Sequence, residues 1–132
     1  MDLQAIMQRY GQELGTPEGI PSNTEGSYEL PITDELTIMA RSLQPGIEFF
    51  CNLGQFSLER ENQFLQDLMV ANLFGISTRG SVLGLAPDGK TVILFHEILD
   101  DLPYQNFMEA FEDFCNVAET WHDSAKGIIN NT

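Results

Sequence analysis

The segment from Val82 to Leu99 restricts the possible folds of this 132-residue chain more than any other. Two β-prone stretches, VLGLA and TVILFHEIL, flank the turn sequence Pro87-Asp88-Gly89-Lys90. Proline presets φ at the first turn position and glycine accepts the left-handed one, so a type I turn with a glycine bulge is the expected connection. The segment therefore predicts an antiparallel β-hairpin, and any fold for the chain must contain a sheet.

Three further β-prone runs precede this hairpin, between residues 28 and 54. They read YELPI, LTIMARSL and IEFFCNL and are separated by turn residues at 33–35 and 44–46, which predicts an antiparallel three-stranded meander. Pro31 has no N–H to give to a central ladder, so the first run is expected at an edge. Met39 and Phe50 alternate onto the side of their strands that should be polar, which marks them as unusual apolar residues.

Three helices are expected around these strands. The first covers residues 2–14 and the last about 103–125, with Asp100 or Asp101 as a candidate cap, and each has one apolar face. The middle helix starts near Ser57, a candidate N-cap, and ends at Gly75. Its apolar residues cover most of its circumference, which is typical of burial on two sides, either in a central position or against another subunit.

The order of elements predicts an α+β fold: a helix, a three-strand antiparallel meander, a helix, a β-hairpin and a C-terminal helix. A length of 132 residues suits a single domain, 1–132. Residues 15–27 are rich in turn formers and have no apolar period, so they are expected to form a flexible loop, and the tail 127–132 is expected to fray.

Charge excludes two classes of partner. The chain has 20 acidic and 6 basic residues, a net charge of -14, and its basic residues are scattered singly. Nucleic acid requires a basic stripe, and an anionic membrane surface would repel such a chain, so neither is an expected partner. Without an apolar run of about 18 residues or a signal-peptide pattern, the chain is read as a cytoplasmic protein. Cys51 and Cys115 lie in apolar patterns without CxxC spacing, which favours buried reduced thiols over a disulfide.

The residues that could carry chemistry do not form a constellation. His96 and His122 are isolated from each other in sequence, and neither has a ligand or nucleophile at a useful spacing. The acidic group Glu97, Asp100 and Asp101 could attract a cation, but its place just before a helix favours capping. The sequence therefore predicts no catalytic residue, no metal site and no cofactor, and the chain is not expected to be an enzyme.

What remains are surfaces suited to holding a peptide. An amphipathic first helix joined to the body by a loop, a meander with an exposed edge, and strands apolar on both faces provide the two commonest modes of peptide recognition. An extended segment can pair with a sheet edge, and apolar side chains can enter a groove between helix and sheet. The residues thus favour a protein that binds another protein.

The pattern of the chain resembles the class I type III secretion chaperones, small acidic homodimers that bind effector proteins before export. The resemblance extends over nearly the whole chain. It is carried by Ala71-Asn72-Leu73-Phe74-Gly75, Gly80, Leu83-Gly84-Leu85, Gly89, Val92-Ile93-Leu94 and Trp121.

This resemblance implies a bacterial cytoplasmic homodimer that keeps an effector segment ready for export without ATP. The dimer interface it implies consists of Phe64, Leu65, Leu68, Met69, Asn72, Leu73, Leu83 and Leu85. The effector-binding residues it implies are Leu3, Ile6, Met7, Tyr10, Ile38, Met39, Phe49 and Phe50. The sequence departs from the common pattern in its long loop after the first helix and in Pro31.

Three alternatives remain beside the chaperone hypothesis. An adaptor or regulator of the same fold would bind a transcription factor or a component of the secretion apparatus. An acidic inhibitor that mimics nucleic acid would need its carboxylates in a regular stripe, whereas here they alternate with apolar faces. A small enzyme would need a bound metal or cofactor.

Overall fold

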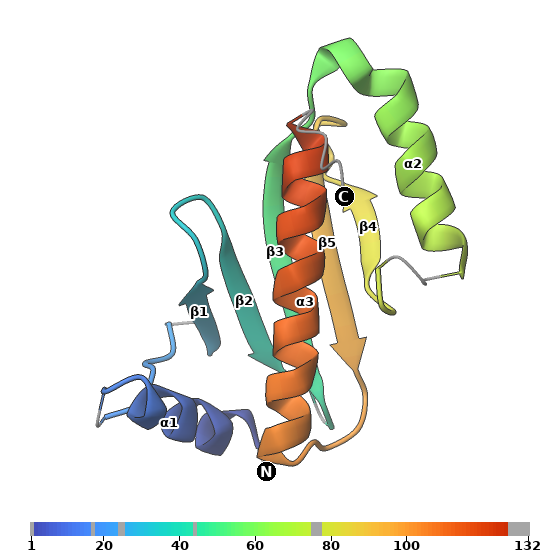
Figure 1. Cartoon of the computed structure of the whole chain (residues 1–132). Helices are drawn as coiled ribbons and strands as arrows, with labels where there is room; N and C mark the ends of the chain where they lie inside the picture. The colour runs from blue at the N-terminus through green and yellow to red at the C-terminus, as the bar shows by residue number, and fades with distance from the viewer. Residues whose placement is uncertain (1, 17, 24–25, 44, 75–77, 127–132) are drawn as a thin grey trace.

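The computed structural model describes residues 2–16, 18–23, 26–43, 45–74 and 78–126. The fold is α+β, in the predicted order of elements (Figure 1). The elements are α1 (Leu3–Glu13), β1 (Ser27–Pro31), β2 (Thr37–Ser42), β3 (Ile47–Gln55), the 3₁₀ turn η1 (Leu58–Arg60), α2 (Glu61–Phe74), β4 (Val82–Leu85), β5 (Thr91–Ile98) and α3 (Tyr104–Ala125). The predicted tail 127–132 lies outside the described residues.

One antiparallel sheet combines the meander and the hairpin. Its strand order is β1-β2-β3-β5-β4, so the hairpin joins the meander through the pairing of β3 with β5. Helix α3 runs along one face of this sheet, α1 lies beside the start of α3, and α2 lies outside the β4 edge (Figure 1). None of the helices in the described residues lies over the opposite face of the sheet (Figure 1).

The core lies between the sheet and α3. Phe49 of β3 is fully buried, and its ring lies 5.6, 5.9 and 5.4 Å from the rings of Phe107, Phe111 and Phe114. These phenylalanines recur at intervals of four and three along α3, the spacing that places side chains on one helical face. Each such ring pair contributes about 1 kcal/mol beyond its buried area. Phe49 therefore fixes where α3 crosses the sheet.

The hairpin turn has the predicted chemistry. Gly89 has φ of 71°, and its N–H donates to the Ala86 carbonyl. The Asp88 carboxylate accepts hydrogen bonds from Lys90 N and from the N–H and hydroxyl of Thr91. These bonds stabilise the ionised carboxylate and lower the pKa of Asp88. The β4–β5 connection is thus determined locally.

Helix α1 is capped by Asp2, which accepts a 2.9 Å hydrogen bond from Ala5 N. The N-caps predicted for the other two helices are wrong. Helix α3 starts after Pro103, which occupies the N-cap position, and no side chain makes a cap bond there. Ser57 precedes a 3₁₀ turn rather than an α-helix, and its hydroxyl makes no cap bond.

Both cysteines carry free thiols. Cys51 is fully buried, and burial raises its pKa to about 11; Cys115 is half-buried, and burial raises its pKa to about 12. Within the described part of the chain, no helix is both long enough and apolar enough to span a bilayer.

Candidate partner-binding surfaces

A row of apolar side chains crosses the face of the sheet opposite α3. The strand register places Met39 beside Phe50, Phe50 beside Phe95, and Phe95 beside Val82. Their sequence neighbours, such as Phe49 and Leu94, are buried, so alternation directs this row outward. Met39, Phe50 and Phe95 are half-buried and Val82 is 43% exposed. We call Met39, Phe50, Phe95 and Val82 the outer row.

A charged row borders the outer row on one side. Arg41 pairs with Glu48 and Glu48 with Glu97 across the same three strands. The Arg41 guanidinium lies 3.1 Å from the Glu48 carboxylate. One guanidinium thus faces two carboxylates, and this border remains negative.

The predicted effector-binding residues separate into two groups. Met39 and Phe50 are cross-strand partners in the outer row, and half-buried Tyr10 packs edge-on against Phe111 at 5.8 Å. The other five have at most 2% of their surface exposed in this protomer: Leu3, Ile6, Met7, Ile38 and Phe49. The whole set stays a prediction. Phe95 and Val82 complete the outer row but are not in the predicted set, although both alternate with buried residues of the hairpin.

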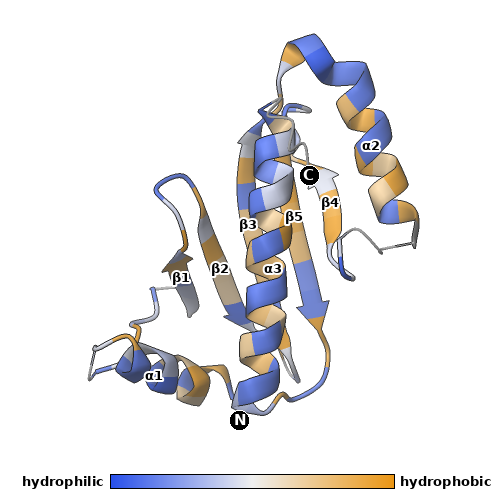
Figure 2. Cartoon of the chain, viewed as in Figure 1, coloured by the Kyte–Doolittle hydropathy of each residue, from blue (hydrophilic) through white to orange (hydrophobic). Residues whose placement is uncertain are grey.

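Helix α2 carries three highly exposed apolar residues. Met69, Val70 and Leu73 are 71%, 70% and 69% exposed, and we call these three residues the α2 ridge. Apolar and polar segments alternate along this helix in Figure 2. Its other side is buried, with Phe64 stacked on Phe56 at 5.4 Å. The wide apolar circumference predicted for the middle helix therefore has one side in the core and one in solvent.

The predicted dimer residues likewise include both exposed and buried side chains. Met69, Leu73 and Leu85 are exposed, as is Val70, which is not in the predicted set. The predicted dimer set as a whole stays a prediction. Leu65 and Asn72 are half-buried, and the remaining three belong to the protomer core: Phe64, Leu68 and Leu83.

Asn72 closes the outer edge of the sheet at β4. Its amide nitrogen donates to the Leu83 carbonyl at 2.6 Å, and its carbonyl oxygen accepts from Leu83 N at 2.9 Å. The side chain thus takes the place of a neighbouring strand and satisfies both backbone groups of an edge residue.

Helix α1 is fastened to the start of α3 by polar contacts. The Tyr104 hydroxyl donates to the Glu13 carboxylate at 2.6 Å, and the Arg9 guanidinium lies 4.1 Å from the centre of the Tyr104 ring. Burial and the neighbouring Glu13 carboxylate raise the pKa of Tyr104 to about 12. The phenol therefore stays protonated and keeps this bond at physiological pH.

His122 joins three elements near the other end of α3. Its Nδ1 lies 2.7 Å from the Leu53 carbonyl and its Nε2 lies 2.7 Å from the Glu35 carboxylate, which also pairs with Lys126. The hydrogen bonds from Lys126 and His122 lower the pKa of Glu35. This histidine is satisfied by structural partners, as expected for an isolated one, and it ties the β1–β2 turn to α3.

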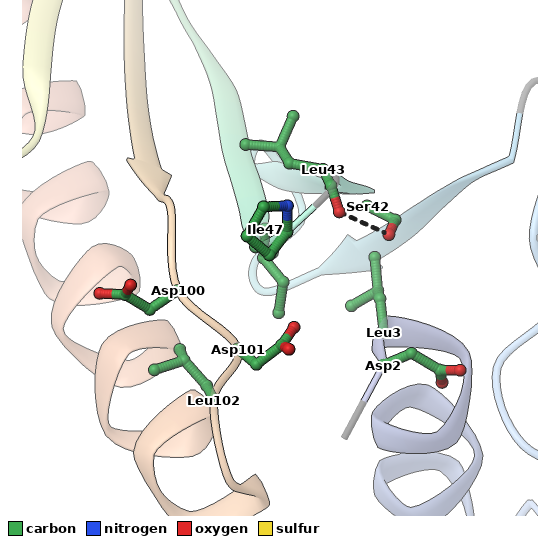
Figure 3. A pocket seen from close by; sticks show the side chains of 10 residues that line it. Asp2, Leu3, Ser42, Leu43, Ile47, Asp100, Asp101 and Leu102 are labelled. Carbon is green, nitrogen blue, oxygen red and sulfur yellow. Dashed lines mark hydrogen bonds between the residues drawn. The ribbon is translucent and has the colours of Figure 1, made fainter.

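A hollow of about 380 Å³ separates the start of α1 from the β2–β3 turn and the β5–α3 connection (Figure 3). Asp2, Asp100 and Asp101 lie around it (Figure 3). Asp2 is already engaged as the α1 cap. Among the described residues, no group of three His, Cys, Asp or Glu side chains is arranged to hold a metal ion.

Most of the basic side chains are paired within the chain. Arg9, Arg41, Arg79 and Lys126 each contact a carboxylate, the partners being Glu13, Glu48, Asp113 and Glu35. These four are among six basic residues in the sequence. The remaining carboxylates therefore dominate the surface charge.

Comparisons with known proteins agree with this architecture. The sequence model of the Tir chaperone protein (CesT) family matches residues 5–122. A protein of Chlamydia pneumoniae is 30% identical over 122 residues, covering 90% of this chain and 92% of its own length.

Two solved structures have the same fold. The HopA1–SchA chaperone–effector complex contains a chain with a TM-score of 0.72 and 11% identity, over 91% of this chain and 92% of that one. The ExsC–ExsE complex contains one with a TM-score of 0.70 and 15% identity, over 96% and 98%.

Proposed function

Because this chain belongs to the Tir chaperone protein (CesT) family, we propose that it is a type III secretion chaperone that binds an extended segment of a secreted effector. It would hold that segment in a non-globular, export-ready form. The likeness to a solved chaperone–effector complex supports this function. The observation that carries it is the outer row, a solvent-facing apolar surface on an acidic body.

The outer row would receive apolar side chains of the effector. Three large side chains buried there would contribute about 5–9 kcal/mol, at about 1.5–3 kcal/mol each. Ordering about five effector residues costs about 5–10 kcal/mol of backbone entropy. The two terms nearly cancel, so a stable complex requires a longer bound segment with contacts at further sites. The negative border at Glu48 and Glu97 would favour basic residues beside the apolar ones.

The protein would act as a homodimer through the α2 ridge. Met69, Val70 and Leu73 lie within two turns of one helix, and a second copy would remove them from water. A dimer also doubles the surface available to one effector chain and so supplies the further contacts that the outer row requires.

No step of this function requires catalysis, a cofactor or ATP. Binding energy comes from apolar burial and backbone pairing, and release would follow when the effector is withdrawn. The residues that carry the proposal are binding residues, with no catalytic role.

The test is recovery of the bound protein from the native cytosol with the tagged chain, followed by identification and affinity measurement. A secreted protein should be recovered, and Met39→Glu should weaken its binding by at least about tenfold because a carboxylate replaces an apolar contact. Thr37→Glu is the matched control on the same strand and face, and it should bind within about twofold of wild type. Recovery of a transcription factor or a secretion-apparatus component instead would refute the effector assignment.

The dimer is tested separately by light scattering during size exclusion. Wild type should have about twice the 14.8 kDa protomer mass. Met69→Glu should shift it to the protomer mass because a charge would be buried in the interface. Gln4→Glu, exposed on α1 and away from α2 (Figure 1), should leave it dimeric. A monomeric wild type would contradict the proposal.

A further inference from the structure

The outer edge of β1 is occupied by the chain itself. Ser22 forms an antiparallel bridge with Tyr28. Asn23 N donates to the Ser27 carbonyl at 2.8 Å, and Ser27 N donates to the Asn23 side-chain oxygen at 3.0 Å. Ser22 and Asn23 thus pair with β1 where the next strand of the sheet would be. We call residues Gly19–Asn23, which end in this pair, the placeholder segment.

The placeholder segment is pressed against α1. Ile20 N donates to the Met7 carbonyl at 3.4 Å, and the Ile20 side chain packs on the core. Gly19 has φ of 80°, and a Cβ there would lie 2.8 Å from the Gln8 Cα. A Cβ on Gly11 would lie 2.5 Å from the Gly19 Cα. Contact this close requires glycine at both positions.

As a strand, the placeholder segment is incomplete. The Ser22–Tyr28 bridge places Pro21 opposite Glu29. The N–H and C=O of Ser27 bond to Asn23 and so point away from β2. In an antiparallel ladder every second residue directs these groups to the same side, so the N–H and C=O of Glu29 also point away from β2. Pro21 has no N–H, so it cannot donate to the Glu29 carbonyl. Any other residue at that position would add a hydrogen bond.

The two edges of the sheet therefore differ. The β4 edge is closed by Asn72 with two hydrogen bonds from within a helix. The β1 edge is closed by a loop segment that pairs over a short length and, at Pro21, offers no N–H to β1. Of these two closures, only the second can be exchanged without moving a helix away from the sheet edge.

We propose that the placeholder segment is an autoinhibitory contact, which occupies the β1 edge until an extended segment of the bound protein displaces it. The incoming segment would be extended, with a large apolar residue where Ile20 now lies and a residue other than proline opposite Glu29. This inference rests on the proposed function, since it specifies how part of the effector segment is held. The extra hydrogen bond to the Glu29 carbonyl favours the incoming strand by about fivefold.

Gly19→Ala is the variant that tests whether the segment can leave. Its Cβ would meet backbone, so the segment should move off α1, and the Asn23 amide should exchange with solvent at least about tenfold faster. Gly15→Ala is the matched control, because Gly15 also has a positive φ, of 90°, but has nothing within 4 Å of an added Cβ. Exchange at the buried β3 residue Phe49 should be the same in all three proteins, which shows that the fold is intact.

Strand acceptance by the β1 edge is tested with a labelled peptide copying residues 18–23 but carrying Pro21→Val. It should bind Gly19→Ala at least about tenfold more tightly than wild type or Gly15→Ala, because the edge is already open. The same peptide with proline retained should bind about fivefold more weakly. If Gly19→Ala does not fold, Ile20→Ser supplies the second variant, since it removes the apolar anchor without a backbone clash and should also bind the peptide more tightly than wild type.

Equal peptide binding by all variants would overturn the proposal, as would an Asn23 amide unaffected by both Gly19→Ala and Ile20→Ser. These measurements use no effector, so their outcome is independent of the proposed function. If the peptide binds as expected but no secreted protein is recovered from cytosol, the edge site stands and the effector assignment falls. If a secreted protein is recovered from cytosol but the peptide does not bind as expected, the protein is a chaperone that does not use the β1 edge.

Discussion

Removal of the Asn72 side chain should loosen the β4 edge by a measurable and predictable amount. Asn72→Ala deletes the two hydrogen bonds to the Leu83 backbone, each contributing about 1 kcal/mol net. Alanine returns about 0.5 kcal/mol through its higher helix propensity. The expected loss in the free energy of unfolding is therefore about 1.5 kcal/mol. For 132 residues, with an unfolding entropy near 0.28 kcal/mol/K, this corresponds to about 5 °C in Tm.

Thermal and urea denaturation at one fixed protein concentration measure this loss, because assembly also affects apparent stability. Asn116→Ala, exposed on α3, is the matched control for helix propensity and should be neutral or slightly stabilising. Asn72→Asp tests the bond geometry, because its carboxylate would face the Leu83 carbonyl. At neutral pH this variant should be at least as destabilised as Asn72→Ala. In acid its stability should recover, because the protonated carboxyl can donate a hydrogen bond to the Leu83 carbonyl. If Asn72→Ala and Asn116→Ala have the same stability, the edge closure by Asn72 contributes nothing and the reasoning is refuted.

Three further perturbations should have distinct effects. Gly46→Ala should lower the free energy of unfolding in urea by several kcal/mol, because at φ of 110° its Cβ would overlap the Ile98 carbonyl. Gly89→Ala, with φ of 71° and open surroundings, should lower it by only about 1 kcal/mol, and similar losses for the two variants would contradict this reasoning. Cys51, with its pKa raised to about 11, should react with a thiol reagent at pH 8 at least about a hundredfold more slowly in the folded protein than in urea. Rapid labelling of the folded protein would instead show that the Cys51 thiol is accessible. Because the pKa of Glu35 is lowered in the folded state, the contribution of this carboxylate to stability is present above its ordinary pKa of 4.5 and is lost as pH falls through the lowered pKa. Below about pH 5, the Tm of wild type should therefore fall more steeply than the Tm of Glu35→Gln. Parallel curves of Tm against pH would count against the Lys126 and His122 contacts.

The local elements of this fold could be predicted because local chemistry determines them. The turn at Asp88 and Gly89 and the phenylalanine spacing of α3 are both complete within one segment of sequence. The caps of α3 and α2 were predicted wrongly because several acceptors precede each helix, and only the chain path selects among them. Pro103 took the position assigned to Asp100 or Asp101.

The candidate surfaces were less accessible to sequence reasoning because they depend on non-local pairing. Periodicity identifies an apolar face on α1 but not what covers it, and Ile6 and Met7 lie wholly in the core of this protomer. Phe95 joins Phe50 only because β5 pairs with β3, an order that the predicted meander and hairpin did not specify. The closure of β1 by residues 19–23 likewise depends on contacts with α1 that no turn motif encodes.

The pairing of basic side chains within the protomer has a consequence for the speed of association. With Arg9, Arg41, Arg79 and Lys126 already beside carboxylates and a net charge of -14, an approaching protein meets a surface whose unpaired charges are mostly negative. Segments carrying lysine or arginine should be drawn in faster than neutral ones, and the advantage should shrink as added salt shortens the Debye length below about 10 Å. Dissociation, which depends on apolar contacts, should respond far less to ionic strength. The charge of this protein would therefore govern how quickly a partner arrives, and the outer row how long it stays.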